Sequence, residues 1–271
     1  MTGVRELLRR YDLQPARGLG QHFLLDEGTL TRIASAAQLT PDEAVLEIGA
    51  GLGNLTRILA ARAGRVVAVE VDRRLLPILE QELAACPTVR LVEGDILALD
   101  PAELMGGQPY KVVANLPYGI TSAVLRHLLE ARVPPQRMVV TVQEEVAERI
   151  VARDGRMSLL AVSVHFYGRP QLLFRLPPGS FYPPPEVTSA VLCVDRHAQP
   201  PVAVRDVEAY FRLVRAGFSQ PRKQLRNSLA AGLGLAPARV AAALQEAGLD
   251  PRQRAERLSL EDWARLWAVL R

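Results

Sequence analysis

The chain has 271 residues, of which 49% are hydrophobic, and its formal net charge is +4. This length accommodates one large domain and a smaller one, with a substantial core. No stretch reaches the ~18 uninterrupted apolar residues of a membrane helix, and residues 1–10 lack the apolar core of a signal peptide. The two cysteines, Cys86 and Cys193, have no metal-binding spacing, which predicts buried thiols in a reducing cytoplasm.

The basic residues are concentrated in the last quarter of the chain. From Arg205 onward there are 12 Lys or Arg and 7 Asp or Glu, whereas the remaining 21 basic and 22 acidic residues nearly cancel. This asymmetry favours a polyanionic partner for the C-terminal part. An ordinary solvated helical surface is the alternative interpretation, and charge alone does not separate the two.

The pattern of apolar residues predicts alternating strands and helices in the first half of the chain. A short amphipathic helix is expected within residues 1–10 and a second helix over 29–39. Strands at 44–48, 66–70, 89–93, 111–114 and 138–142 then alternate with helices at 54–63, 73–85, 120–131 and 143–154. Continuous Val, Leu and Ile strands separated by helices are typical of a parallel sheet covered on both faces.

The pattern changes after Gly155. Residues 160–167 and 189–195 are predicted to form a strand hairpin at the edge of the sheet, and 197–201 form a candidate linker. Beyond it, only helices are expected, at 206–219, 222–231, 236–247 and 259–270. The sequence therefore predicts an α/β domain over residues 1–198 and an all-helical domain over residues 199–271.

The first motif with chemical content is Glu47-Ile48-Gly49-Ala50-Gly51-Leu52-Gly53, at the end of the first predicted strand. Glycines let the backbone approach a ligand closely, and the following helix offers free N–H groups. Glu70 ends the next strand, 21 residues after Gly49, where an acid can accept hydrogen bonds from ribose hydroxyls. A purely structural turn would show the same glycines, so this motif alone is a weak signal.

Two further strand ends carry polar residues. Asp95 follows the third strand and is placed to accept a hydrogen bond from an adenine amine, although an Asp after Gly commonly caps a turn. Asn115-Leu116-Pro117-Tyr118 follows the fourth strand. The Asn115 side-chain oxygen and a backbone carbonyl of Leu116–Pro117 can accept both hydrogens of an adenine N6 amine, and Tyr118 offers a ring for stacking.

A third element is the proline-rich run that begins Phe181-Tyr182-Pro183-Pro184-Pro185. An aromatic ring held by prolines is rigid, so Phe181 is predicted to cover the face of the target base opposite Tyr118. A core phenylalanine in a proline-rich loop is the alternative.

Together, these motifs resemble those of the ribosomal-RNA adenine dimethyltransferase family, and most closely its bacterial small-subunit members. The resemblance covers nearly the whole chain, through residues 20–24, 47–56, 69–72, 93–97, 115–118, 181–189 and 219–228. It implies a class I, Rossmann-like methyltransferase fold dependent on S-adenosylmethionine. That fold has a mostly parallel seven-stranded sheet with an antiparallel edge strand, and a small helical C-terminal domain.

The resemblance also implies an activity. The expected reaction is transfer of methyl groups to N6 of two adjacent adenosines in the 3′-terminal hairpin of 16S rRNA. The expected substrate is the small ribosomal subunit or its precursor, and the expected enzyme is a cytoplasmic monomer that needs neither a metal ion nor a membrane.

The same resemblance assigns roles to individual residues. The cofactor would contact His22, Leu24, Gly49, Gly51, Glu70, Asp95 and Asn115; the catalytic residues would be Asn115, Leu116, Tyr118 and Phe181; and RNA would contact Arg222, Lys223 and Arg226. Two positions depart from the family pattern. Family members usually carry Asn in place of His22, and a basic residue is common in place of Pro221.

Three alternatives remain at this stage. A macrolide-resistance methyltransferase of large-subunit rRNA shares the front motifs, but residues 219–228 and the form of the 181–189 loop argue against it. A non-catalytic assembly factor or transcription-associated RNA-binding relative is disfavoured by intact Asn115, Tyr118 and Phe181. A nicotinamide dehydrogenase would explain the glycines and the acid but not the tetrapeptide at 115.

Overall fold

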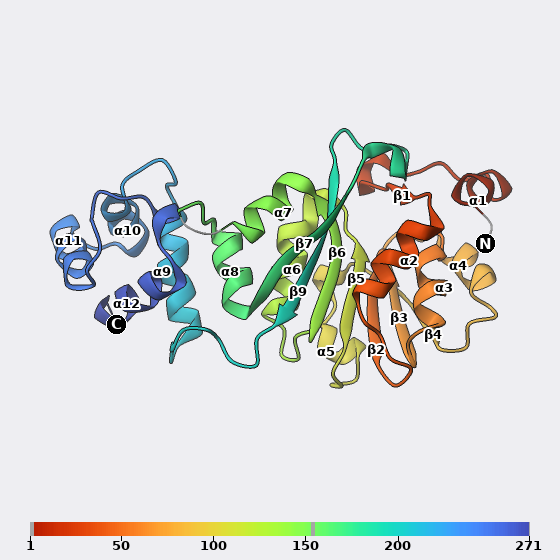
Figure 1. Ribbon diagram of the computed structural model, residues 1–271, viewed down its shortest axis with the longest axis horizontal. Helices are drawn as coiled ribbons and strands as arrows, with labels where there is room; N and C mark the ends of the chain where they lie inside the picture. The colour runs from red at the N-terminus through yellow and green to blue at the C-terminus, as the bar shows by residue number, and fades with distance from the viewer. Residues whose placement is uncertain (1–2, 153–154, 271) are drawn as a thin grey trace. The chain divides into compact units, whose positions relative to one another are not determined.

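The computed structural model describes residues 3–152 and 155–270, and the chain forms two compact units (Figure 1). Met1–Ala147 and Pro170–Arg196 make up the first, here called the sheet unit. Glu148–Arg169 and His197–Arg271 make up the second, the helical unit. The predicted second domain begins at residue 199, two residues after the observed return to the helical unit at His197. The sequence predicts that residues 148–169 belong to the first domain, whereas in the structure they belong to the helical unit.

The sheet unit contains a seven-stranded sheet in the order β4-β3-β2-β5-β6-β9-β7. Neighbouring strands from β4 to β6 pair in parallel, and β9 pairs antiparallel with β6. The predicted antiparallel strand is therefore present but is not at the edge, because β7 lies outside it. The strands are β2 Ala44–Ile48, β3 Arg65–Glu70, β4 Val89–Glu93, β5 Lys111–Asn115, β6 Arg137–Gln143, β7 Gly168–Leu176 and β9 Ser189–Arg196.

The helices of the sheet unit lie within a few residues of the predicted ranges, except the short helix α5, which was not predicted. They are α1 Val4–Arg10, α2 Glu27–Ala36, α3 Asn54–Ala60, α4 Leu76–Glu82, α5 Pro101–Leu104 and α6 Thr121–Leu129, while α7 Glu144–Val151 crosses the unit boundary. Helix α2 begins two residues earlier than predicted because the Asp26 carboxylate accepts a hydrogen bond from the Thr29 amide at 2.6 Å. Nowhere in residues 3–152 and 155–270 is a helix long and apolar enough to span a membrane.

A separate two-stranded ribbon pairs distant parts of the sheet unit. Strand β1, Phe23–Leu24, pairs antiparallel with β8, Phe181–Tyr182. Short 3-10 helices occur at Arg17–Leu19, Ile96–Ala98, Tyr118–Ile120, Pro178–Ser180 and, in the helical unit, Ala255–Arg257.

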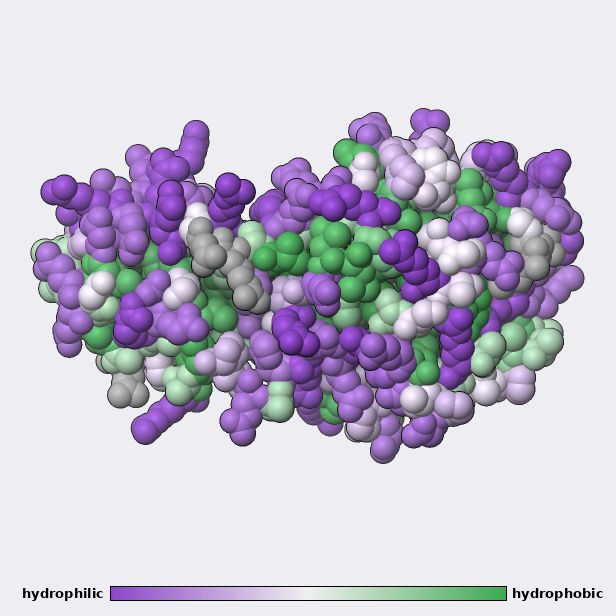
Figure 2. All heavy atoms as spheres, in the orientation of Figure 1, coloured by the Kyte–Doolittle hydropathy of each residue, from purple (hydrophilic) through white to green (hydrophobic). Residues whose placement is uncertain are grey.

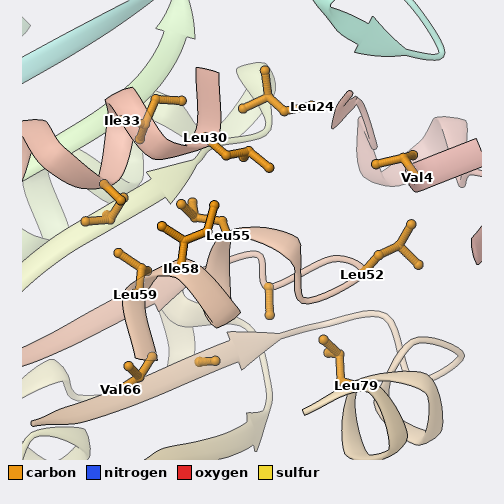
Figure 3. Close-up of a cluster of buried hydrophobic side chains, with 14 of the residues drawn as sticks. Val4, Leu24, Leu30, Ile33, Leu52, Leu55, Ile58, Leu59, Val66 and Leu79 are labelled. Carbon is orange, nitrogen blue, oxygen red and sulfur yellow. The ribbon is translucent and has the colours of Figure 1, made fainter. Parts of the chain in front are cut away.

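The core of the sheet unit includes a cluster packed between helices and one face of the sheet. Leu55, Ile58 and Leu59 of α3 lie between Leu30 and Ile33 of α2 and the sheet strand β3 (Figure 3). Each is at most 8% exposed. Their spacing places them on one helical face, so burial of this face fixes α3 against β3.

The parallel pairing brings four strand ends to one edge of the sheet. Ile48 of β2 pairs with Val69 of β3 on one side and with Ala114 of β5 on the other, and Glu70 pairs with Glu93 of β4. Glu70 and Asn115 are the last residues of β3 and β5, and the glycine turn and Asp95 follow the ends of β2 and β4. The register thus gathers, at the carboxyl edge, the polar residues that the sequence had placed at separate strand ends.

The helical unit is built from α8 Leu159–Tyr167, α9 Val207–Phe218, α10 Leu225–Leu233, α11 Pro237–Glu246 and α12 Leu260–Leu270. Its core holds an aromatic cluster in which the Phe166 ring lies 5.2 Å from Tyr210 and 5.1 Å from Phe211. Trp263 is fully buried in the same cluster of apolar residues.

The prediction of a strand at residues 160–167 is wrong, because this segment is helix α8. A short apolar run does not by itself distinguish a buried strand from a buried helix. Here the Ser158 hydroxyl accepts a hydrogen bond from the Ala161 amide at 3.1 Å and starts a helix. Residues 161–166 are all buried, so no polar face marked the helical period. The edge strand is β7 instead.

A substitution at Gly217 of α9 tests how closely this helix packs against Trp263 in the helical unit. A Cβ atom there would lie 2.3 Å from the Trp263 ring, so Gly217→Ala is expected to destabilise the protein by about 1–3 kcal/mol, although Ala normally favours a helix. Gly18→Ala is the control, since nothing lies within 4 Å of its added Cβ. Calorimetric unfolding of both variants measures the effect, and equal stability would contradict this packing.

Candidate active site

A cavity opens at the carboxyl edge of the sheet unit. Its wall includes eight of the residues predicted from the sequence, namely His22, Gly49, Gly51, Glu70, Asp95, Asn115, Leu116 and Tyr118. Apolar side chains of Ile48, Val71 and Ile96 line it as well. The cavity therefore combines flat apolar walls with two carboxylates and an amide.

The glycine turn requires glycine for its backbone conformation and, at Gly51, also for lack of space. Gly49 and Gly51 have φ angles of 78° and 60°, which side chains rarely adopt. A Cβ on Gly51 would lie 3.2 Å from the Phe23 ring, and one on Gly49 would lie 3.7 Å from the Asn115 carbonyl. The backbone consequently forms the cavity floor beside Asn115.

Glu70 connects the end of β3 to this turn. Its carboxylate accepts hydrogen bonds from the amides of Gly51 at 2.8 Å, Val71 at 3.0 Å and Asp72 at 2.9 Å. Burial raises the pKa of Glu70, and the three amides act in the opposite direction. Because a carboxylate has about four acceptor positions, one on Oε2 is left for a ligand hydroxyl.

Asp95 is exposed, and its Oδ1 accepts a hydrogen bond from the Leu97 amide at 3.0 Å. This is the turn cap that was the alternative interpretation of this residue. The cap engages one oxygen, and Asp95 also lines the cavity, so capping and ligand binding are compatible here.

Asn115 is oriented by a backbone group. Its Nδ2 donates a hydrogen bond to the His22 carbonyl at 2.8 Å. Since a carbonyl only accepts, this contact fixes which end of the amide is nitrogen and leaves Oδ1 as an acceptor. The Pro117 carbonyl already accepts from the Ile120 amide and the Thr121 hydroxyl. The Leu116 carbonyl is therefore the better candidate for the second acceptor.

Tyr118 is fixed by its hydroxyl, which lies 2.7 Å from the buried Ser189 Oγ. Burial raises the pKa of Tyr118, and the Ser189 contact partly offsets this. The His22 ring lies 5.8 Å from the Tyr118 ring at an interplanar angle of 19°. His22 Nδ1 lies 2.7 Å from the Pro183 carbonyl and so carries the proton in this contact.

The structure does not bring Phe181 to the cavity wall. Its side chain is 2% exposed and packs in the core, with Leu24 as its partner in the β1–β8 ribbon. This corresponds to the alternative interpretation, a core phenylalanine. A stacking role for Phe181 stays a prediction that would require the ring to leave the core.

Leu24 is also buried, but it lines a small second cavity that shares Gly49, Gly51 and Asn115 with the main one. Glu47, which had no predicted role, lines the same small cavity. It is 1% exposed, and among the described residues no hydrogen-bond partner reaches either carboxyl oxygen. Burial raises the pKa of Glu47 to about 8, with a further contribution from the Glu70 charge and an opposing one from Thr56.

Two other supporting residues could not be identified from the sequence. Gln21 donates a hydrogen bond to Asp72 at 2.8 Å, which ties the segment before β1 to the segment after β3. Ser189 holds Tyr118. Both contacts join residues more than 50 positions apart, and neither residue type marks a site in isolation.

The predicted RNA-binding residues lie in the helical unit. Arg222 and Lys223 are exposed in the turn between α9 and α10, which begins at Leu225 rather than at the predicted residue 222. Arg226 is half-buried in the first turn of α10, and its Nε donates to Asn227 at 3.4 Å.

Comparison with known proteins identifies the family of this chain. A profile of the family described as ribosomal RNA adenine dimethylase matches residues 14–271. The chain belongs to this family. A ribosomal RNA small subunit methyltransferase A from Dehalococcoides mccartyi is 50% identical over 99% of this chain and 93% of its own length. Its counterpart from Pelotomaculum thermopropionicum is 46% identical over 96% and 93%.

Among solved structures, the 23S rRNA methyltransferase ErmE is 33% identical and superposes with a TM-score of 0.72, covering 92% of this chain and 99% of its own. As a ribosomal RNA adenine dimethylase, the protein is a methyltransferase whose cofactor is S-adenosylmethionine. The cavity fits such a cofactor: the two carboxylates Glu70 and Asp95 suit a cationic nucleoside, and the apolar walls suit a purine.

The buried Glu47 carboxyl predicts a pH-dependent stability. Between about pH 4.3, where an unfolded Glu ionises, and about 8, the folded chain holds one more proton, so stability falls as pH rises. Wild type should lose up to about 1.4 kcal/mol per pH unit relative to Glu47→Gln in this window. Urea unfolding of both proteins at several pH values measures the difference.

Glu43→Gln is the matched control. Burial raises the pKa of Glu43, but its contact with Lys111 at 2.7 Å and its hydrogen bonds with Thr40 together outweigh burial and lower this pKa. Its contribution to stability is therefore present above the unfolded pKa and should stay constant from about pH 5 to 8. A stability of wild type that rises with pH relative to Glu47→Gln would show that Glu47 is ionised and paired.

Proposed function

We propose that the protein dimethylates N6 of two adjacent adenosines in the 3′-terminal hairpin of 16S rRNA, within the small ribosomal subunit or its precursor. The orientation of Asn115 carries this proposal: its amide oxygen is directed as an acceptor beside Tyr118, in the same cavity as Glu70 and Asp95. The high identity to small-subunit enzymes supports the choice of substrate.

Each site residue then has a defined task. Glu70 would accept a ribose hydroxyl of the cofactor, Asp95 would accept from its adenine amine, and the turn at Gly49 and Gly51 would let its methionine end approach the backbone. His22 and Leu24 would border that end. When bound, the cofactor supplies an electrophilic methyl group on a sulfonium.

The protein acts mainly on the target amine. An adenine N6 lone pair is delocalised into the ring, which makes the amine a poor nucleophile. Asn115 Oδ1 and the Leu116 carbonyl would accept its two hydrogens and favour a tetrahedral nitrogen, whose lone pair can then attack. Because the His22 carbonyl and the stiff Pro117 hold these acceptors in advance, little reorganisation is needed during the reaction.

Stacking would position the base. Tyr118, held by Ser189, presents a fixed ring on which an extruded adenine can lie. The methylated N6 would be cationic, and the same two oxygens would stabilise that charge until the proton leaves to solvent. The helical unit would contribute RNA binding through the basic turn at Arg222, Lys223 and Arg226.

Asn115→Ala tests the catalytic step. Loss of one preorganised acceptor should lower kcat by about 10²–10³-fold, while the dissociation constant for S-adenosylmethionine stays within a few-fold, since Glu70 and Asp95 are intact. Single-turnover methyl transfer and isothermal titration calorimetry measure the two effects. Near-normal turnover would show that Asn115 does not have this role.

The substrate is tested with ribosomal subunits that lack the modification. Small subunits should accept four methyl groups per particle, mapped to two adjacent adenosines near the 3′ end, and large subunits should accept none. Methylation of large subunits alone would favour a 23S rRNA methyltransferase such as ErmE, and no transfer to either would favour a non-catalytic assembly factor.

A further inference from the structure

A second groove, of about 490 Å³, lies in the sheet unit between α1, the turn that follows it and strand β8. Leu8, Leu13 and Tyr182 contribute apolar surface, and Arg5 and Arg9 contribute two cations. Asp12 is the acidic residue in this lining. None of the site residues discussed above lines this groove.

The two arginines are available for a ligand. Arg5 and Arg9 are one helical turn apart on α1, so they share a face, and both are exposed. Within residues 3–152 and 155–270, neither forms an ion pair with an acid. By contrast, the neighbouring Arg10 pairs with Glu6 at 3.2 Å and with Glu82 at 3.4 Å. Figure 2 shows hydrophilic residues gathered around α1, toward the right of the view.

An aromatic ring lies beside one of these cations. The Arg5 guanidinium carbon is 5.5 Å from the centroid of the Tyr182 ring, and Tyr182 is only partly buried. A partly buried tyrosine beside a guanidinium group, with a second arginine in the same groove, is the combination used to bind single-stranded nucleic acid, in which rings stack on bases and cations contact phosphates.

The β1–β8 ribbon joins this groove to the active site. Phe23 lines the catalytic cavity, and its register partner across the ribbon, Tyr182, lines the groove. Paired residues of this kind are separated by about 5 Å. The next residue, Pro183, accepts the hydrogen bond from His22, which also lines the cavity. A nucleotide near the target adenosine can therefore reach the groove.

We propose that this groove binds an unpaired nucleotide of the substrate RNA that flanks the target adenosines. Arg5 and Arg9 contact its phosphates, and the base stacks on Tyr182. This inference rests on the proposed function, in which an extruded adenosine occupies the neighbouring cavity. An acidic peptide segment of a ribosomal protein is the competing occupant, and it is less suited to the aromatic ring.

The experiment compares Arg5→Gln/Arg9→Gln with Arg10→Gln, a control on the same helix whose side chain is already paired. Methylation of unmodified small subunits is measured at several salt concentrations. The double variant should raise KM about 10-fold with kcat and the affinity for S-adenosylmethionine unchanged. It should also reduce the slope of log KM against log salt by about 1.4–2, because two phosphate contacts are lost. Arg10→Gln should stay within about two-fold.

Tyr182→Leu separates stacking from charge. It should raise KM several-fold while leaving the salt slope unchanged. If the double variant matches Arg10→Gln in both KM and slope, the groove does not bind RNA. If the double variant loses affinity for intact subunits but not for naked hairpin RNA, the acidic peptide is the occupant and the proposal is wrong.

A direct measurement keeps this inference distinct from the proposed function. Fluorescence anisotropy of a labelled, unmethylated hairpin RNA reports binding whether or not methyl transfer occurs. Weaker binding by the double variant than by Arg10→Gln supports the groove even if wild type proves inactive. Equal binding overturns it even if wild type is fully active.

Discussion

The contacts of the Glu70 carboxylate are the constraint on which the cofactor side of the cavity depends. This side chain, at the end of β3, accepts hydrogen bonds from three backbone amides, and one of these amides belongs to the glycine turn after β2. The turn has positive φ angles at Gly49, Gly51 and Gly53. Glu70 therefore couples two strand ends, and burial of this charge is tolerated because amide dipoles surround it.

The substrate side of the cavity depends on a different set of contacts, which join parts of the chain that are far apart in sequence. The Asn115 side chain forms a hydrogen bond with the His22 carbonyl, the His22 ring with the Pro183 carbonyl, and the Tyr118 hydroxyl with Ser189. Each contact restrains one group that would touch the base. Since these hydrogen bonds form within the chain itself, the entropic cost of ordering the loops is met on folding and does not add to the activation free energy of the reaction.

The sequence was informative where function is carried by short motifs at strand ends. The parallel strands, the glycine turn, Glu70, Asp95 and Asn115 all followed from local patterns, since parallel strands place their carboxyl ends together. It was misleading where burial removes periodicity. Residues 161–166 are buried on every face, so no exposed polar face marked the helical period and helix α8 resembled a strand.

Phe181 illustrates a related limit. In a sequence, a proline-flanked aromatic residue is compatible with a stacking surface and with a core position. The structure shows that the Phe181 ring is buried, in a strand, β8, that pairs with β1. The supporting roles of Ser189 and Gln21, and the burial that raises the pKa of Glu47, depend on neighbours that are remote in the chain. No pattern within a window of sequence could reveal them.

The assignment of residues 148–169 to the helical unit has a consequence for how such a protein can be divided. Helix α8 supplies Ala161, Val162 and Phe166 to the apolar core formed with the C-terminal helices. A gene fragment that stopped after residue 198 would encode this helix without the partners that cover it. Because the helical unit is formed by two separate segments of the chain, recombination at a single junction cannot add or remove it. Exchange of this unit between relatives has to transfer both segments together.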